Sequence, residues 1–176
     1  NLSVTNTSVI DTFKIEWNGT NYTAWGDGII GLWHLDNSTK DESKFNNSVT
    51  TVSGNVNCSV AVAGTTKYQS TACEFDGTGD DMTVPSSASN NYDGHMTIEF
   101  WMKPRAAMDS TTGRKDIVTK LNAWWLLYDV NSGGCADGAL TLEIGSTCTN
   151  AANVVTTLTK DVWYYIVGVH NDSNDN

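Results

Sequence analysis

The four cysteines have the most distinctive chemistry in this chain: Cys58, Cys73, Cys135 and Cys148. None belongs to a Cys-x-x-Cys pair, and the three histidines lie far from them in sequence, so a zinc site is not indicated. Their even number predicts two disulfides. We favour the two local pairings, Cys58–Cys73 and Cys135–Cys148, because each closes a loop of roughly 15 residues, worth on the order of 3 kcal/mol. The alternative is four reduced thiols in a cytosolic protein.

Asn-x-Ser/Thr sequences are a second chemical signal, since each is an acceptor for an N-linked glycan in a secreted protein. They begin at eight asparagines: Asn1, Asn6, Asn18, Asn21, Asn37, Asn46, Asn57 and Asn171. Seven of the eight lie in the first 57 residues, so that stretch should present an exposed face. Together with the cysteines, these sites predict an extracellular or cell-surface glycoprotein.

An acidic turn is the candidate metal site. Asp76, Asp80 and Asp81 lie within six residues that also contain two glycines, and Ca²⁺ prefers such oxygen ligands in a flexible loop. The alternative is a turn whose carboxylates hydrogen-bond the backbone. We expect no required cofactor and leave bound Ca²⁺ as an option.

Carboxylate catalysis is not indicated. Glycoside hydrolysis needs two carboxylates close together, and residues i and i+2 of a strand would supply them, but Glu99 and Glu143 are each isolated on their strands. Glu99 shares a strand face with Trp101 and Lys103, and we expect it to form an ion pair with Lys103. Motifs of nucleophilic, phosphate-binding or metalloprotease sites are absent from the sequence. The sequence therefore predicts no catalytic residues and a protein that is not an enzyme.

Aromatic side chains are the candidate ligand-binding residues, because lectin-like sites place exposed aromatics beside amides and carboxylates. Trp124 and Trp125 are adjacent, so on a strand they face opposite ways and one of them must leave the local core. Trp101, Trp163 and Tyr165 are further residues that would line a curved sheet. Core packing is the alternative for each tryptophan.

The charge balance excludes two classes of partner. The formal net charge is −10, and the ten Lys and Arg residues form no cluster, so neither nucleic acid nor an anionic membrane surface should bind. No signal peptide or membrane span is visible, and direct membrane insertion is not expected. The opening Asn1-Leu2-Ser3 suggests a mature or excised segment of a longer protein.

Period-two alternation recurs along the chain and predicts strands rather than helices. The expected strands cover residues 12–17, 29–35, 48–52, 58–62, 70–75, 81–84, 96–102, 116–120, 123–129, 139–144, 153–158 and 162–167. The last is apolar on both faces, so we expect it to be central. A dozen short strands in 176 residues predict an all-β, two-layer antiparallel β-sandwich.

Five stretches follow one another along the chain in a distinctive order: Gly31-Leu32-Trp33-His34-Leu35-Asp36, Cys73-Glu74-Phe75-Asp76-Gly77 with Asp80 to Pro85, Met96-Thr97-Ile98-Glu99-Phe100-Trp101-Met102-Lys103-Pro104, Asp116 to Lys120, and Asp161 to His170. These stretches resemble laminin-G-like, concanavalin A-like jelly-roll domains. Their order and spacing cover about residues 29–172. The resemblance implies a jelly roll over 29–176, preceded at 1–28 by a linker, the tail of an earlier domain or an exchanged strand. Family members continue with further strands, so the domain is expected to be incomplete at its C-terminal side.

Two kinds of function remain open from the resemblance. One is a non-catalytic surface module for adhesion that binds glycans or surface proteins. The other is a structural subunit of an extracellular filament or sheath, self-associating into a polymer completed by strand exchange. A glycoside hydrolase is the third and least favoured alternative.

Overall fold

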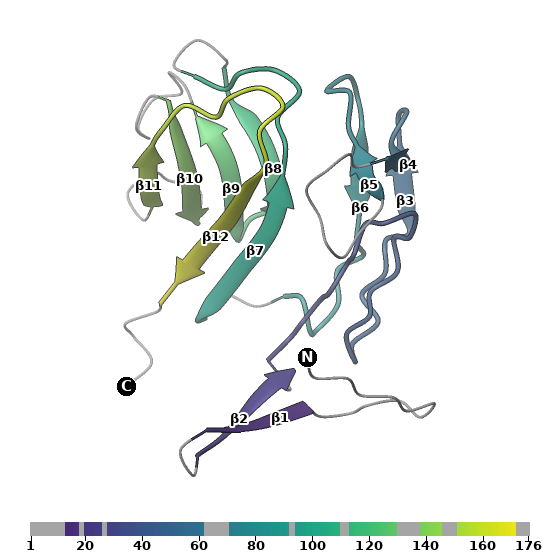
Figure 1. The fold of residues 1–176 in the computed structure, drawn as a ribbon, viewed down its shortest axis with the longest axis vertical. Helices are drawn as coiled ribbons and strands as arrows, with labels where there is room; N and C mark the ends of the chain where they lie inside the picture. Colours follow the sequence, from purple (N-terminus) through teal and green to yellow (C-terminus); the bar gives the residue numbers. More distant parts are fainter. Residues whose placement is uncertain are drawn as a thin grey trace. The chain divides into compact units, whose positions relative to one another are not determined.

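The computed structural model describes residues 13–17, 20–25, 28–61, 71–91, 94–109, 113–129, 138–145 and 151–171. For the first two stretches and for Asp129, only the backbone is described. The chain divides into two compact units, Asn1–Asn91 and Tyr92–Asn176. Within the described ranges every regular element is a β-strand (Figure 1). The boundary expected near residue 28 stays a prediction.

The first unit contains six short strands, β1 (Phe13–Trp17), β2 (Thr20–Trp25), β3 (Thr51–Ser53), β4 (Asn57–Ala61), β5 (Thr71–Glu74) and β6 (Asp81–Thr83). They pair as the antiparallel two-stranded sheets β1–β2, β3–β6 and β4–β5. The predicted strand at 12–17 is confirmed as β1, and its partner is β2 of the same chain. β2 was not predicted, because its sequence Thr-Asn-Tyr-Thr-Ala-Trp contains no aliphatic residue larger than alanine. Exchange of β1 between subunits stays a prediction.

The prediction of a strand at 29–35 is wrong. This segment contributes only an isolated bridge between Trp33 and Asp41. Leu35 and Asn37 have φ angles of 56° and 67°, in the left-handed region that interrupts an extended chain. The apolar alternation around Trp33 therefore reflects burial of a looped segment rather than a ladder.

Asp41 organises this looped segment. Its side chain is buried, and its two oxygens accept four hydrogen bonds: from the backbone N–H groups of Leu32 (2.7 Å), Ser43 (2.8 Å) and Asn47 (2.6 Å), and from the Ser43 hydroxyl (2.7 Å). Burial alone raises the pKa of Asp41, but the four donors together outweigh it and hold the pKa below its ordinary value. The carboxylate thus replaces a ladder as the acceptor for this loop.

Asn47 extends the same network to a distant part of the first unit. Its Nδ2 donates to the Ile30 carbonyl (2.8 Å) and the Ser89 hydroxyl (3.0 Å), and its Oδ1 accepts from the Ser87 hydroxyl (2.8 Å). Every polar atom of this buried amide therefore has a partner, as burial requires. Together, Asp41 and Asn47 fix residues 30–48 against 87–89. We call these two residues the polar hub.

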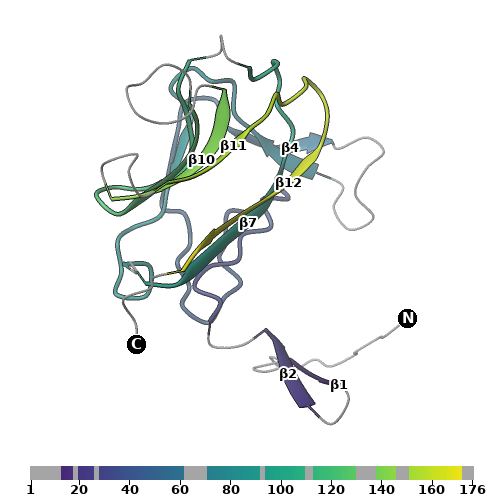
Figure 2. The same cartoon turned by 90° about the vertical axis from the view of Figure 1, so that its left-hand side faces the viewer.

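The second unit contains the longer strands, β7 (Met96–Met102), β8 (Lys115–Lys120), β9 (Trp124–Asp129), β10 (Ala139–Ile144), β11 (Ala151–Val155) and β12 (Tyr164–His170). One sheet has the order β11-β10-β9-β8, and the other pairs β12 with β7; all pairs are antiparallel. Figure 2 shows β7 and β12 running side by side, with β10 and β11 in a separate layer. Most predicted strands here agree with the structure to within a few residues.

The core of the second unit lies between these two layers. Leu126 of β9, Leu142 of β10 and Ile166 of β12 are buried together, and the inward side chains of β7, Met96, Ile98, Phe100 and Met102, pack against them. Gly168 of β12 lies close to this cluster: a Cβ there would be 3.2 Å from Leu142 Cδ2. A second cluster joins Met108, Tyr128 and Leu158, and the buried Tyr128 hydroxyl donates to the Thr156 carbonyl (2.7 Å). The all-β antiparallel sandwich is therefore confirmed.

The expectation that the strand at 162–167 is central is wrong. Within the described part of the chain β12 pairs only with β7, and its outward residues Tyr165, Val167 and Val169 are exposed. Ile166 and Gly168 face the core, which explains half of the apolar pattern. The other half forms an apolar outer surface, which a sequence pattern cannot distinguish from a second buried face. No helix among the described residues has the length and hydropathy needed to span a membrane.

Candidate binding face

The outer face of the β7–β12 sheet gathers exposed aromatic, aliphatic and charged side chains. Alternation in β7 turns Ile98, Phe100 and Met102 inward and leaves Thr97, Glu99 and Trp101 outside. On β12 the outward residues are Tyr165, Val167 and Val169. Trp101 is 59% exposed and Tyr165 is 49% exposed, which is unusual for aromatics of this size. We call this surface the aromatic face.

Trp101 and Tyr165 form the centre of the aromatic face. They are direct partners in the antiparallel register. Their ring centroids lie 5.1 Å apart, with the ring planes tilted by 36°. Aromatic pairs at this separation attract each other, so each ring restricts the orientation of the other. The pair therefore presents two ordered π-surfaces to solvent.

Glu99 supplies the polar group of this face. Its Oε2 accepts a 2.6 Å hydrogen bond from the Tyr165 hydroxyl. That bond, followed by burial and the negative charge of Glu99, raises the pKa of Tyr165 above its ordinary value. The phenol therefore stays protonated over the physiological range, and the carboxylate is oriented beside the two rings.

The ion pair expected between Glu99 and Lys103 is wrong. The Lys103 ammonium instead lies 5.3 Å from the ring centroid of Trp163, in cation–π geometry, while Glu99 bonds Tyr165. Trp163 is half-buried, and its Nε1 is a buried donor with no partner among the described residues. Charge complementarity predicted Lys103 as the partner of the Glu99 carboxylate. The partner in the structure is Tyr165, on the neighbouring strand β12.

Glu99 is exposed on the outer side of β7, whereas Glu143 is buried on the side of β10 that faces away from β7 and β12. Leu142 faces the core between the sheets, so its neighbour Glu143 points away from β7 and β12. Glu99 points outward from β7, because Ile98 and Phe100 face the same core. Two stacked sheets, spaced about 10 Å apart, separate the two carboxylates. These two residues therefore cannot flank one glycosidic bond, which requires carboxyl groups roughly 5–9.5 Å apart.

Trp124 and Trp125 occupy β9 on opposite faces, and both are half-buried. Trp124 shares the inward face with Leu126, which belongs to the core. Trp125 shares the other face with the fully buried Leu127 and lies opposite Glu143 in the register. A ligand role for either tryptophan stays a prediction, and neither offers a surface as open as that of Trp101.

The acidic turn uses its carboxylates to hold its own backbone. Asp80 Oδ1 accepts from the Asn55 N–H (2.5 Å), and its Oδ2 accepts from the Asp76 N–H (2.6 Å). These two bonds, that from Asp76 first, lower the pKa of Asp80. Asp76 accepts from the Thr78 N–H (2.7 Å), and Asp81 from the Thr83 hydroxyl (3.3 Å). Across the described ranges no group of three His, Cys, Asp or Glu residues is arranged to hold a metal, and Ca²⁺ at this turn stays a prediction.

The cysteine prediction is confirmed for one pair. Cys58 of β4 and Cys73 of β5 form a disulfide with a sequence separation of 15. It indicates an oxidising environment, because such bonds are rare in reducing compartments. Cys135 and Cys148 lie outside the described residues.

Four of the eight predicted glycan acceptors have side chains that the structure describes. Asn37, Asn46, Asn57 and Asn171 are exposed, and only the backbone of Asn21 is described. Asn1, Asn6 and Asn18 lie outside the described residues. Exposure is a requirement for a glycan acceptor, and glycosylation of these residues stays a prediction.

The stacked antiparallel sheets define a β-sandwich domain, and the aromatic face is its candidate binding surface. A family model of the laminin-G type, described as the concanavalin A-like lectin/glucanases superfamily, matches residues 76–175. The chain belongs to this superfamily, as the sequence resemblance predicted. No curated protein and no solved structure matches the chain. The superfamily unites binding modules with glucanases, so family membership agrees with carbohydrate or protein binding in general.

Proposed function

We propose that this chain is a non-catalytic extracellular recognition module that binds glycans on the aromatic face. The supporting observation is the exposed Trp101–Tyr165 pair beside a carboxylate held by a 2.6 Å hydrogen bond. A sugar ring presents C–H groups on its faces and hydroxyls around its rim. Aromatic rings suit the first, and the acceptor oxygens of Glu99 suit the second. The arrangement combines apolar contact area with one fixed polar group, as ligand sites do.

The positions of the carboxylates support binding rather than hydrolysis. Glu99 is exposed on the outer side of β7 and Glu143 is buried on the far side of the β8–β11 sheet, and Oε2 of Glu99 is already occupied by the Tyr165 hydroxyl. A general acid would need a raised pKa and a second carboxylate on the same face. The proposed module therefore retains its ligand without cleaving it.

An extracellular site of action is part of the proposal. The Cys58–Cys73 disulfide supports it, because the bond persists in oxidising compartments. The net charge of −10 disfavours polyanionic partners, so neutral glycans fit this surface better than sulfated or phosphorylated ones. Adhesion to a neighbouring cell surface or matrix is the biological role that we infer.

The test is binding of the purified chain to a glycan array, repeated with Trp101→Ala. We expect the variant to lose at least about tenfold in affinity, because an exposed aromatic at the centre of a site carries much of the binding energy. Leu121→Ala is the matched control, since Leu121 is a large, exposed apolar residue away from β7 and β12. Full retention by Trp101→Ala, with loss in Trp124→Ala or Trp125→Ala, would move the site to β9. Hydrolysis of a bound glucan would contradict the proposal directly.

A structural subunit of an extracellular filament is the second candidate, and β11 favours it. This strand pairs only with β10 among the described strands, and its Val154 and Val155 are 63% and 71% exposed. An exposed apolar edge strand is a template for pairing with another chain. If this role holds, the purified chain forms fibres in negative stain, and Val155→Lys suppresses them.

A further inference from the structure

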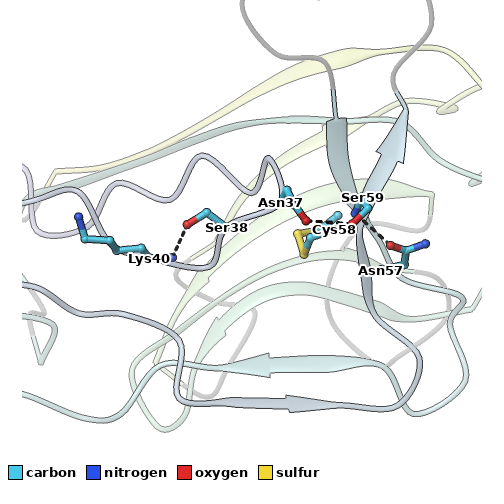
Figure 3. Close-up of a disulfide and its surroundings, with 7 residues drawn as sticks. Asn37, Ser38, Lys40, Asn57, Cys58 and Ser59 are labelled. Atoms are coloured by element: carbon cyan, nitrogen blue, oxygen red, sulfur yellow. Dashed lines mark hydrogen bonds between the residues drawn. A yellow bond between two sulfur atoms is a disulfide. The ribbon is translucent and has the colours of Figure 1, made fainter.

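Two glycan-acceptor sequences that are distant in the chain meet at β4. The backbone N–H of Asn37 donates to the Cys58 carbonyl (2.9 Å), which places Asn37 beside this strand. The hydroxyl of Ser59 then donates to Oδ1 of Asn37 (2.9 Å), and the Ser59 N–H donates to Oδ1 of Asn57 (3.0 Å) (Figure 3). Ser59 is the third residue of the Asn57-Cys58-Ser59 sequence, so one serine holds both acceptor asparagines.

Both amides are held by the oxygen and not by the nitrogen. N-glycans attach to Nδ2, and neither Asn37 nor Asn57 donates a hydrogen bond from Nδ2 to any described residue, while both side chains are exposed. Asn47 and Asn90, which do not begin an acceptor sequence, behave differently. Nδ2 of Asn47 donates to Ile30 and Ser89, and that of Asn90 donates to the Pro85 carbonyl. The fold thus leaves free the atom that glycosylation needs at Asn37 and Asn57.

We propose that Asn37 and Asn57 form a paired N-glycosylation site, with both positions occupied in the same molecule. In each reaction Nδ2 bonds to the anomeric carbon of a phosphate-activated sugar donor and gives one proton to a base of the host transferase. The bond between the anomeric carbon and the phosphate oxygen breaks, and its electron pair leaves with the phosphate. The hydrogen bonds to Oδ1 survive this change, so the glycosylated chain keeps the folded geometry.

The disulfide is compatible with both glycans. Along β4, Asn57 and Ser59 are exposed, whereas Cys58 between them is half-buried and bonds Cys73 on β5. Strand alternation therefore separates the glycan from the sulfur atoms. Asn37 and Asn57 also lie on the side of β4 that faces away from β5. On that side the Asn37 N–H already bonds the Cys58 carbonyl. Bulky sugars at this edge would block pairing with a second chain.

The test begins with the full chain secreted from a host whose N-glycosylation is verified on a reporter glycoprotein. Enzymatic release of N-glycans in heavy-oxygen water converts each occupied asparagine to labelled aspartate, which peptide mass spectrometry locates. We expect label at Asn37 and Asn57, and intact masses that include both glycans on one molecule. Absence of label at either position, or molecules that carry only one of the two glycans at a time, would overturn the pairing.

Asn37→Asp and Asn57→Asp are the matched variants, because each keeps the shape and the acceptor oxygen and replaces the glycan-accepting NH₂ group by a carboxylate oxygen. Each should lose one glycan mass and leave the other site at wild-type occupancy. Asn122→Asp is the control: Asn122 is exposed, has a φ of 63° like Asn37, and begins no acceptor sequence, so the glycan mass should not change. Light scattering of the double variant should show more association than wild type. A double variant as monomeric as wild type would overturn the protective role of the glycans at this edge.

Discussion

The Tyr165 hydroxyl on β12 donates a 2.6 Å hydrogen bond to Oε2 of Glu99 on β7, diagonally across the antiparallel ladder. The same tyrosine stacks at a tilt against Trp101, its direct ladder partner. One side chain therefore aligns both the apolar and the charged part of the aromatic face. Changes at Glu99 should be detectable at Tyr165 before any ligand is known.

Glu99→Gln should lower the pKa of Tyr165 toward its ordinary value, because the hydrogen bond to the carboxylate is the main cause of the increase. Spectrophotometric titration of tyrosinate measures this change. Tyr164 is the internal reference: hydrogen bonding to the side chain of Thr159, and then to its N–H (2.8 Å), lowers the pKa of Tyr164, and Glu99→Gln should leave that pKa unchanged. For Tyr165 the stabilisation is complete below its ordinary pKa and disappears as the pH rises through the higher folded value. An unchanged tyrosine titration would contradict this role of Glu99.

Asp41→Asn should destabilise the chain by about 2–4 kcal/mol, because an amide has one acceptor oxygen where four donors now converge, and its NH₂ group would face N–H and O–H donors. Urea unfolding measures the loss. Asp76→Asn is the control: Asp76 is exposed and accepts one described bond, so its loss should stay within about 0.5–1 kcal/mol. Equal effects of the two variants would show that the polar hub is not a centre of stability.

The pH dependence of stability should also contain a contribution from Asp41. Its folded pKa lies below the ordinary value, so its contribution is fully present above the unfolded pKa near 3.8 and is lost as the pH falls through the folded value. Wild type should therefore lose stability in acid more steeply than Asp41→Asn. Parallel curves for the two proteins between neutral and strongly acidic pH would argue against this assignment.

Gly168→Val should destabilise the sandwich by about 1–3 kcal/mol, because even a Cβ at this position lies 3.2 Å from Leu142 Cδ2 and a branched side chain would overpack the core. Thermal unfolding measures the effect. Combining the change with Leu142→Ala should recover part of the loss, since the shorter side chain makes room. A strictly additive double variant would show that Leu142 is not the limiting neighbour.

Replacing Cys58 and Cys73 by serine should cost on the order of 3 kcal/mol, the value expected for a loop closed over about 15 residues. Mass spectrometry of alkylated protein, before and after reduction, verifies the bond. Denaturant unfolding then compares the double variant with the oxidised parent. A parent that loses no stability on reduction would show that the hairpin β4–β5 does not need its covalent link.

The elements that sequence reasoning predicts well are those in which alternation decides the structure. Met96 to Met102 alternate strictly, and the structure turns every second residue of this strand into the core. Cys58 and Cys73 are close in sequence, so the local pairing is entropically favoured and is the one observed. Residues 29–35 mislead the same reasoning, because side chains such as that of Asp41, which accepts from the Leu32 N–H, bond this segment where a strand would need a ladder.

The aromatic face could be predicted only in part. The sequence places Glu99 and Trp101 on one strand face, and the structure agrees. The partner of Glu99 is a tyrosine 66 residues away, and no local rule favours that tyrosine over Lys103, which follows Glu99 by four positions in the sequence. Likewise, the apolar sequence of β12 did not indicate that Val167 and Val169 face outward. An apolar side chain favours burial, but its presence in the sequence does not show whether another element covers it.

The hydrogen bonds between Asn47 and the distant Ser87 and Ser89 have a practical consequence for recombinant expression. A fragment cut to residues 76–175, the range of the family match, would retain Ser87 and Ser89 but discard the amide that both hydroxyls bind. It would also lose both Cys58 and Cys73, and with them the disulfide of the β4–β5 hairpin. Expression boundaries chosen from homology alone would thus leave two serines without their hydrogen-bond partner and remove a covalent link, and a boundary upstream of Ile30 avoids both defects.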